Sequence, residues 1–346
     1  QNFAFRDHFL EQEYDLSKVM FITTANDKDA IPRPLLDRME VIELSGYLET
    51  EKVEIAKRHL IPKQLEKHGL KKSQLTISDE AIVELIRGYT HEAGVRELER
   101  ETAAVCRKAA MDIGSGKARV RVGKQKLAAY LGAPKYTHGA IDAINEIGLA
   151  NGLAWTSFGG ETLQIEVQIV PGSGQVILTG KLGDVMQESA KAALTFIKAH
   201  AEEFGITLPL DKKDIHLHVP EGAVPKDGPS AGITIMTAML SALSGIPARA
   251  DTAMTGEITL RGRVLEIGGL REKLLAAYRA GIKRVLIPKA NEKDLSDVPD
   301  EVKANMEIIG VASAFDVIPL ALEHTPQKTA DAFIPQHAHS GAAAAQ

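Results

Sequence analysis

The chain has 346 residues, of which 44% are hydrophobic and 25% are charged, a composition typical of folded proteins and unlike that of disordered chains. Its formal net charge of -5 at pH 7 gives no support for DNA as a partner, although a local basic patch is not excluded. The single cysteine cannot form an intrachain disulfide, and no apolar run is long enough to span a membrane. These features favour a cytoplasmic location without membrane contact, and the length allows two or three domains.

Two short apolar runs in residues 1–44 predict strands. Residues 19–24 are apolar and partly β-branched, as in a buried parallel strand. A polar loop and Pro32-Arg33-Pro34 end this run, and residues 41–44 form the second one. The chain begins with Gln1 rather than with methionine, so we expect it to be a piece of a longer protein.

Residues 45–132 are rich in helical patterns. These patterns predict helices at 50–60, 78–89 and 94–113, and Ser78 is placed to cap the second one. A short strand at 118–122 and a helix at 124–131 complete this region. Cys106 lies on the apolar pattern of the third helix, which favours a core position over a catalytic thiol. Residues 133–148 lack periodicity and contain prolines and glycines, so we expect a linker there.

From residue 149 to residue 325, short alternating strands and helices follow one another. Strands are expected at 163–169, 176–178, 215–219 and 285–287, and helices at 183–204, 230–243 and 270–280. The chain as a whole is therefore predicted to be an α+β multidomain protein, with an α-helical domain followed by an α/β domain. Residues 326–346 lack a core-forming pattern and are expected to be a disordered tail. We predict no metal site from His337 and His339 in this tail.

A loop rich in glycine and proline, PKDGPSAG at residues 225–232, ends where an apolar helix is predicted to begin. Serine before a helix is most often an N-cap. Ser230 can also be a nucleophile, because the N–H groups at a helix N-terminus favour an alkoxide and the oxyanion of a tetrahedral intermediate. Two prolines and Gly228 hold the backbone more rigidly than capping requires, so Ser230 is the candidate nucleophile.

A serine hydroxyl needs a base in order to act as a nucleophile. His216 and His218 alternate with apolar residues and so point to one face of a strand, where either could form a Ser-His-Asp triad with Asp227. Histidines on a half-exposed strand are more often structural. The triad therefore stays open as one alternative.

Lys273 is the other candidate base. It lies in the first turn of a predicted helix, where the helix dipole and neighbouring leucines can lower the lysine pKa toward neutrality, as a general base requires. A solvated surface lysine would show the same local pattern. Thr255 follows a strand pattern and could orient the lysine ammonium with its hydroxyl group.

The segments PKDGPSAG (225–232), MTGEI (254–258) and GGLREK (268–273) resemble the three hallmark blocks of the Lon protease domain. The resemblance extends through GLAWT (152–156) and GDVMQES (183–189), and so covers residues 150–323. It implies a Ser-Lys dyad, in which Ser230 attacks the scissile carbonyl, Lys273 is the general base and Thr255 supports the lysine. Trp155 is a substrate-side candidate only through its place in this domain, and a core position is the default expectation.

The first 132 residues resemble the end of an AAA+ ATPase module. Residues 20–26 are similar to the sensor-1 strand with Asn26 at its tip, residues 35–38 to the segment that carries an arginine finger, here Arg38, and residues 93–98 to the sensor-2 helix with Arg96. This resemblance assigns residues 1–44 to the end of the large subdomain and 45–132 to the small helical subdomain. No Gly-x-x-x-x-Gly-Lys-Ser/Thr phosphate loop occurs. We therefore expect negligible ATP hydrolysis by this chain alone, whereas the full-length family member uses ATP and Mg.

The main expectation is a serine endopeptidase that degrades unfolded or damaged proteins and needs no cofactor for peptide hydrolysis. The resemblance further implies a homohexameric ring. A non-hydrolytic assembly or binding module and a Ser-His-Asp hydrolase remain the alternatives. The position of Asp227, three residues before Ser230, suggests one more hypothesis, in which its carboxylate draws Lys273 away from the serine in a resting state.

Overall fold

The computed structural model describes residues 2–9, 11–25, 30–42, 46–136, 144–156, 159–220 and 226–327. Asn26, the end of the expected strand at 41–44, part of the predicted linker and the segment 328–346 lie outside the described residues. The chain divides into two compact units, Gln1–Ser45 and Gly46–Gln346, which are described separately below.

The described residues of the first unit contain little regular structure. Its elements are the 3-10 turn η1 (Asn2–Ala4), the hairpin of β1 (Phe5–Arg6) and β2 (Glu13–Tyr14), and the short helix α1 (Arg33–Leu36). The buried strand predicted at residues 19–24 is wrong: this segment is irregular, and Met20 and Ile22 are more than 80% exposed. A strand needs a neighbour for its backbone hydrogen bonds, and no described strand pairs with residues 19–25.

Residues 46–136 form a helical body around one apolar core. Its helices pack with the two-stranded parallel sheet of β3 and β4, and their inward faces include Leu85, Leu98 and Cys106, each at most 2% exposed. The core position predicted for Cys106 is thereby confirmed. The elements are α2 (Glu49–Ile55), the π-helix η2 (Ala56–Leu60), α3 (Ile61–Lys67), β3 (Leu75–Ile77), α4 (Asp79–Tyr89), α5 (Arg96–Gly114), β4 (Val120–Val122) and α6 (Lys124–Leu131).

Two helix ends in this body show how local chemistry sets the boundaries. The Ser78 hydroxyl accepts a hydrogen bond from the Ala81 N–H and caps α4, as predicted. The helix predicted to stop at residue 60 instead continues to Lys67. A proline usually interrupts a helix, because it lacks an N–H group and its ring clashes with the preceding turn. Here the helix continues past Pro62 because the π-helix η2, directly before it, has a wider turn that accommodates the ring.

A seven-stranded mixed sheet forms the centre of residues 144–327, with the strand order β13-β12-β9-β5-β6-β8-β7. The pairs β13-β12, β12-β9, β9-β5 and β8-β7 are parallel, and β5-β6 and β6-β8 are antiparallel. The strands are β5 (Leu149–Thr156), β6 (Gly159–Pro171), β7 (Val176–Thr179), β8 (Lys213–His218), β9 (Thr252–Met254), β12 (Arg284–Pro288) and β13 (Glu307–Val311).

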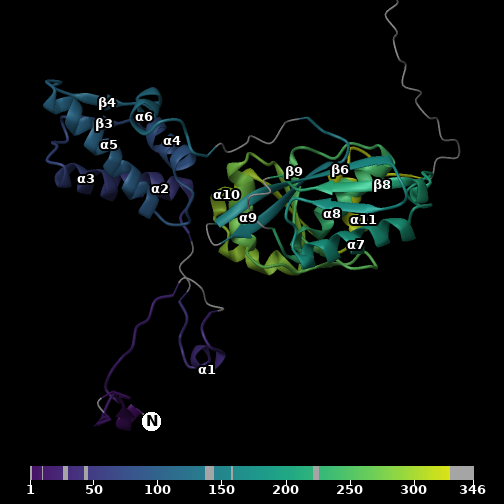
Figure 1. Ribbon diagram of the computed structural model, residues 1–346, viewed down its shortest axis with the longest axis horizontal. Helices are drawn as coiled ribbons and strands as arrows, with labels where there is room; N and C mark the ends of the chain where they lie inside the picture. The colour runs from purple at the N-terminus through teal and green to yellow at the C-terminus, as the bar shows by residue number, and fades with distance from the viewer. Residues whose placement is uncertain are drawn as a thin grey trace, which may run out of the picture. The chain divides into compact units, whose positions relative to one another are not determined.

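Helices cover this sheet on both faces. The helices α7 (Asp184–Ala199), α8 (Gly232–Ser244) and α11 (Ala314–Ala321) bury one large apolar core against it and lie together on one side (Figure 1). The helices α9 (Leu270–Arg279) and α10 (Asp300–Asn305) pack in a second cluster with Leu153, Ala253 and Val285. Helix α8 is buried all round, as its nearly continuous apolar sequence predicts. The expected α+β class is confirmed, although α7 ends at Ala199 rather than at residue 204.

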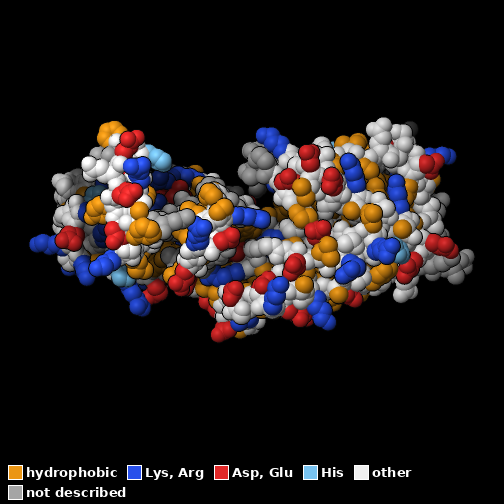
Figure 2. Space-filling model, turned by 90° about the horizontal axis from the view of Figure 1, so that it is seen from below, with side chains coloured by type: hydrophobic (Ala, Val, Ile, Leu, Met, Phe, Trp, Pro, Cys, Tyr) orange, Lys and Arg blue, Asp and Glu red, His pale blue; other side chains and the backbone are white. Residues whose placement is uncertain are grey.

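Smaller elements connect these layers. They are the hairpin of β10 (Glu257–Ile258) and β11 (Val264–Leu265) and the 3-10 segments η3 (Leu210–Lys212), η4 (Pro229–Ala231) and η5 (Lys289–Asp297). Among the described residues, no helix is both long and apolar enough to cross a membrane. Basic and acidic side chains are interspersed on the face that Figure 2 presents. This face therefore offers no large area of one charge to attract a polyanion.

Helix α9 lies unusually close to strand β6, and this approach depends on a glycine. A methyl group at Gly160 would lie 1.9 Å from the carbonyl oxygen of Glu272. We expect Gly160→Ala to reduce the free energy of unfolding by about 3 kcal/mol, because the strand and the helix must separate. Chemical denaturation measures this loss. Gly268→Ala is the matched control, since its methyl group would meet no atom within 4 Å and should change stability by less than about 0.5 kcal/mol. Equal stability of the two variants would contradict the prediction.

Candidate active site

Ser230 lies in η4, directly before the buried helix α8. Its carbonyl oxygen accepts hydrogen bonds from the Gly256 N–H at 2.7 Å and from the Thr255 hydroxyl at 3.2 Å. These two bonds tie the serine backbone to the turn that follows strand β9. The Ser230 side chain is half-buried, and within the part of the chain that the structure describes its hydroxyl makes no hydrogen bond. The hydroxyl is therefore free to bond with a substrate or a base.

Thr255 links the serine backbone to the candidate base. The Lys273 Nζ donates a hydrogen bond to the Thr255 Oγ1 at 3.1 Å, and the same hydroxyl donates to the Ser230 carbonyl oxygen. A hydroxyl has one proton to donate and lone pairs to accept, so both bonds can be made together. Thr255 is fully buried and Lys273 is 2% exposed. The structure thus brings together Ser230, Thr255 and Lys273, as the sequence predicted.

Lys273 lies in an environment that disfavours its charged form. Burial lowers the pKa of the Lys273 ammonium from 10.5 to about 8, because the charged form loses its hydration. Leu270 and Leu274 are buried on either side of it along α9. Its N–H bonds to the Gly269 carbonyl in the first turn of the helix, where the dipole also opposes a cation. No described carboxylate forms an ion pair with it. A substantial neutral fraction near neutral pH is what a general base needs.

Asp227 holds the loop before Ser230 against helix α7. Its Oδ1 accepts hydrogen bonds from the Met186 N–H at 3.0 Å and from the Gly228 N–H at 2.8 Å. A carboxylate at a helix N-terminus is stabilised by the helix dipole. The hypothesis that Asp227 draws Lys273 away from the serine is wrong for this structure, because the carboxylate bonds to α7 and the lysine bonds to Thr255. Gly228 has a φ of 121°, a conformation that residues with a side chain rarely adopt.

The two histidines of strand β8 share a different partner. The Thr179 Oγ1 lies 3.0 Å from His216 Nε2 and 2.7 Å from His218 Nδ1. The rings point to one side of the strand, as their alternation predicted. One nitrogen of each ring contacts the Thr179 hydroxyl, and the Asp227 carboxylate bonds to the backbone of α7. The geometry therefore gives no support to a Ser-His-Asp triad.

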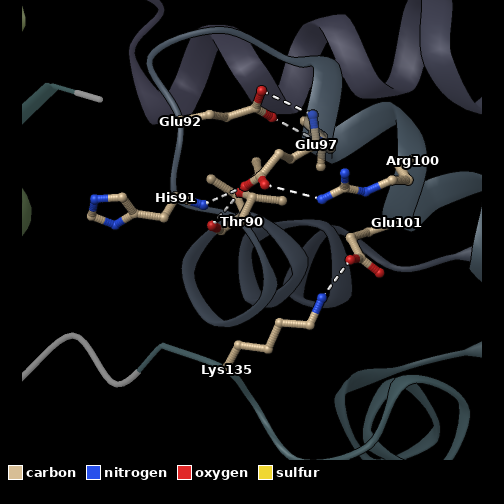
Figure 3. A network of polar contacts seen from close by, with 9 residues as sticks. Thr90, His91, Glu92, Glu97, Arg100, Glu101 and Lys135 are labelled. Carbon is tan, nitrogen blue, oxygen red and sulfur yellow. Dashed lines mark hydrogen bonds and ion pairs between the residues drawn. The ribbon is translucent and has the colours of Figure 1, made fainter. Parts of the chain in front are cut away.

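The predicted ATPase residues that the structure describes are exposed. Arg38 follows α1 in the first unit, and Arg96 is the first residue of α5 in the second. The start of α5 is held by a polar network around residues 90–101 (Figure 3). The Glu92 carboxylate accepts from the N–H groups of Glu97 and Leu98 and so caps the helix. This cap fixes the backbone beside Arg96, whose side chain stays accessible. Asn26 lies outside the described residues.

Two residues near the site differ from what the sequence suggested. Trp155 is 59% exposed on strand β5, so the core position expected for it is wrong. Its indole lies against Gly269, the residue before helix α9. Asn291, which the sequence analysis did not single out, is 1% exposed and bonds to the backbone of the loop that leads into α9. Only its burial distinguishes it, and burial of a single polar residue has no clear signature in a sequence.

Comparison with known proteins finds matches to two parts of the chain. Residues 121–324 match the Lon protease (S16) C-terminal proteolytic domain, and residues 66–122 match the Lon protease AAA+ ATPase lid domain. The chain is 58% identical over 326 residues to the Lon protease of Nitratidesulfovibrio vulgaris and 56% identical over 329 residues to that of Escherichia coli K12. These matches cover 93% and 94% of this chain, but only 40% and 42% of the relatives. The chain therefore belongs to the Lon protease family.

Proposed function

We propose that this chain is a serine endopeptidase in which Ser230 is the nucleophile and Lys273 the general base. The observation that carries the proposal is a buried lysine of lowered pKa whose side-chain nitrogen, among the described residues, hydrogen bonds only to Thr255, and Thr255 also binds the Ser230 backbone. The family to which the chain belongs supports the same chemistry. Unfolded or damaged polypeptides are the proposed substrates, and peptide hydrolysis requires no cofactor.

The reaction begins when neutral Lys273 accepts the proton of the Ser230 hydroxyl. The Ser230 Oγ then attacks the scissile carbonyl carbon, and a tetrahedral oxyanion forms. We assign the Ser230 N–H as one donor to this oxyanion, whereas the N–H groups of Gly232 and Ile233 at the start of α8 already bond to the carbonyl oxygens of Pro229 and Gly256. Protonated Lys273 gives its proton to the leaving amine, and water hydrolyses the acyl-enzyme by the same steps. In this scheme the Lys273 Nζ leaves its hydrogen bond with Thr255 and bonds to the Ser230 hydroxyl. Once Lys273 is protonated, its ammonium can donate to the Thr255 hydroxyl again.

We extend the proposal to the remaining parts of the chain, as segments of a longer ATP-dependent protease. We assign residues 1–44 to the end of the AAA+ large subdomain, 45–132 to the small helical subdomain, 133–148 to a linker, 149–325 to the protease domain and 326–346 to a tail. Asn26, Arg38 and Arg96 would then serve ATP and Mg in a full-length protein. The chain spans about two fifths of the relatives it matches, which are 40% and 42% covered. Assembly into a homohexamer and a cytoplasmic location belong to this proposal.

Single substitutions separate the proposed dyad from the alternatives. We expect Ser230→Ala and Lys273→Ala to lose at least about a thousandfold in kcat/KM, because each removes one half of the proton transfer. His218→Ala should stay within about threefold of the unmutated chain, since its ring bonds to Thr179. Cleavage of a fluorogenic peptide measures all three. Full activity of Lys273→Ala would contradict the dyad. Loss of activity only in His218→Ala would favour a triad, and an inactive unmutated chain would favour a binding module.

The pH dependence of cleavage reports which base is used. Lysine accepts a proton only in its neutral form, and the pKa of Lys273 is lowered to about 8. We therefore expect kcat/KM to rise about tenfold per pH unit below that value and to level off above it. Initial rates between pH 6 and pH 10 test this, on the condition that circular dichroism shows an unchanged fold across the range. A midpoint near the ordinary histidine value of about 6.5 would contradict a lysine base.

We expect negligible ATP hydrolysis by this chain, because its sequence contains no phosphate loop to bind the nucleotide phosphates. Phosphate release in the presence of Mg-ATP measures it. The same preparation should cleave the fluorogenic peptide, which shows that the protein is folded and active. Robust magnesium-dependent phosphate release would contradict the assignment.

A further inference from the structure

The position of Lys273 depends on how helix α9 begins, and α9 begins without a side-chain cap. Gly269 occupies the N-cap position with a φ of 67°, and Gly268 precedes it. Two consecutive glycines give this entry a large conformational freedom. Lys273 lies only one turn into the helix, and its N–H bonds to the Gly269 carbonyl. Any change in the path of the chain at Gly268 and Gly269 therefore moves the lysine.

Asn291 fixes the residue directly before the two glycines. Its Oδ1 accepts a hydrogen bond from the Ile267 N–H at 3.0 Å, and its Nδ2 donates to the Ile267 carbonyl oxygen at 2.9 Å. One amide side chain thus satisfies both backbone groups of Ile267, as a paired strand would. The Nδ2 also donates to the Asp294 Oδ2 at 2.7 Å, which sets the orientation of the amide. With an exposed fraction of 1%, Asn291 is shielded from competing water.

The anchored residue also contributes to the apolar surroundings of the lysine. The Ile267 side chain packs against the cluster that contains Leu270 and Leu274. These two leucines come from the turns of α9 on either side of Lys273. Holding Ile267 in place therefore keeps water away from the helix segment that carries the lysine.

We propose that Asn291 is a positioning residue for Lys273: by pinning both backbone groups of Ile267 it sets the start of α9 and keeps the lysine buried beside Thr255. Asn291 does not touch the reacting atoms. The inference rests on the proposed Ser230–Lys273 chemistry. It adds a residue from η5, outside the three segments that carry the hallmark motifs.

The chain contains a built-in probe of this junction. Trp155 is its single tryptophan, and the indole lies so close to Gly269 that a methyl group there would be 2.8 Å from the Trp155 Cγ. Tryptophan emission therefore reports the start of α9 without any reference to catalysis. This readout can fail or succeed independently of the proposed function.

The test compares Asn291→Ala with the unmutated chain in two measurements. Without the anchor, water should reach Lys273 and its pKa should return toward the ordinary lysine value. We expect the midpoint of kcat/KM against pH to rise by about one unit, so that cleavage at pH 7 falls about tenfold while KM stays within about twofold. Trp155 emission of the folded variant should shift as well. The charged groups of α9 and of the elements packed on it are not substituted in this variant; they are Arg271, Glu272 and Arg279 on α9, Lys289, Glu292, Lys293, Asp294 and Asp297 on η5, Glu161 and Glu166 on β6, and Asp300, Glu301 and Lys303 on α10.

Asn151→Ala is the matched control. Asn151 is also buried, at 3% exposed, and also donates a side-chain hydrogen bond to a backbone carbonyl, that of Ala250. Its loss should lower the melting temperature in the same way but leave the pH midpoint and the Trp155 emission unchanged. If Asn291→Ala does not fold, Asn291→Ser serves instead, because its hydroxyl can still bond to one backbone group of Ile267 and places no second carboxylate beside Asp294. We expect a smaller shift in the same direction.

Each outcome decides one question. An alkaline shift of the midpoint in the Asn291 variants but not in Asn151→Ala supports the proposal. An unchanged midpoint and unchanged emission, with activity reduced only in proportion to the folded fraction, would overturn it and make Asn291 a purely structural residue. If the unmutated chain showed no pH midpoint near 8, or if Lys273→Ala stayed active, the proposed function itself would be contradicted. A changed Trp155 emission in Asn291→Ala would in that case still show that Asn291 sets the start of α9.

Discussion

Burial of an ammonium group without a neighbouring carboxylate is the constraint on which the site depends. Lys273 is 2% exposed, and its Nζ hydrogen bonds to the Thr255 hydroxyl rather than to a charged partner. Burying a charge in this way is unfavourable, because the lost hydration is not replaced by an ion pair. The lysine responds by releasing its proton more easily, which lowers its pKa to about 8. A carboxylate partner would instead have kept the lysine pKa high, and a lysine that stays protonated cannot act as a base.

The Lys273 side chain has a single hydrogen bond, to an uncharged hydroxyl, so the surrounding backbone has to keep the lysine and the serine in place. Two side chains do this, one near the segment of Ser230 and one near the segment of Lys273. Asp227 fastens the loop of Ser230 to the start of α7, and Asn291 fastens Ile267 at the entry of α9. Thr255 joins the two halves, since it bonds both to the Ser230 carbonyl and to Lys273. Asp227 bonds to backbone N–H groups, Thr255 to a carbonyl oxygen and to the lysine, and Asn291 to Ile267 and Asp294, so none of these bonds places a carboxylate on the lysine.

Predictions from the sequence succeeded where local chemistry decides and failed where distant partners decide. The Ser78 cap, the bounds of α6 and the buried positions of α8 and Cys106 follow from short-range patterns. The strand expected at residues 19–24 failed because a strand requires backbone partners from elsewhere in the chain. Trp155 was expected inside the core and is exposed, since the outcome depends on how α9 and β5 approach each other.

The sequence by itself determined the α+β class, the motifs around Ser230, Thr255 and Lys273, and the absence of a phosphate loop. These features are contained in short segments, each with its own pattern. Only the tertiary structure decided which candidate base lies beside the serine backbone. His218 and Lys273 were both open in the sequence, and the sheet order places the lysine next to Thr255 while Thr179 holds the histidine. It also decided the partners of Asp227 and Asn291. Asp227 bonds to a residue 41 positions away in the chain and Asn291 to one 24 positions away, and such bonds depend on the packing of whole elements.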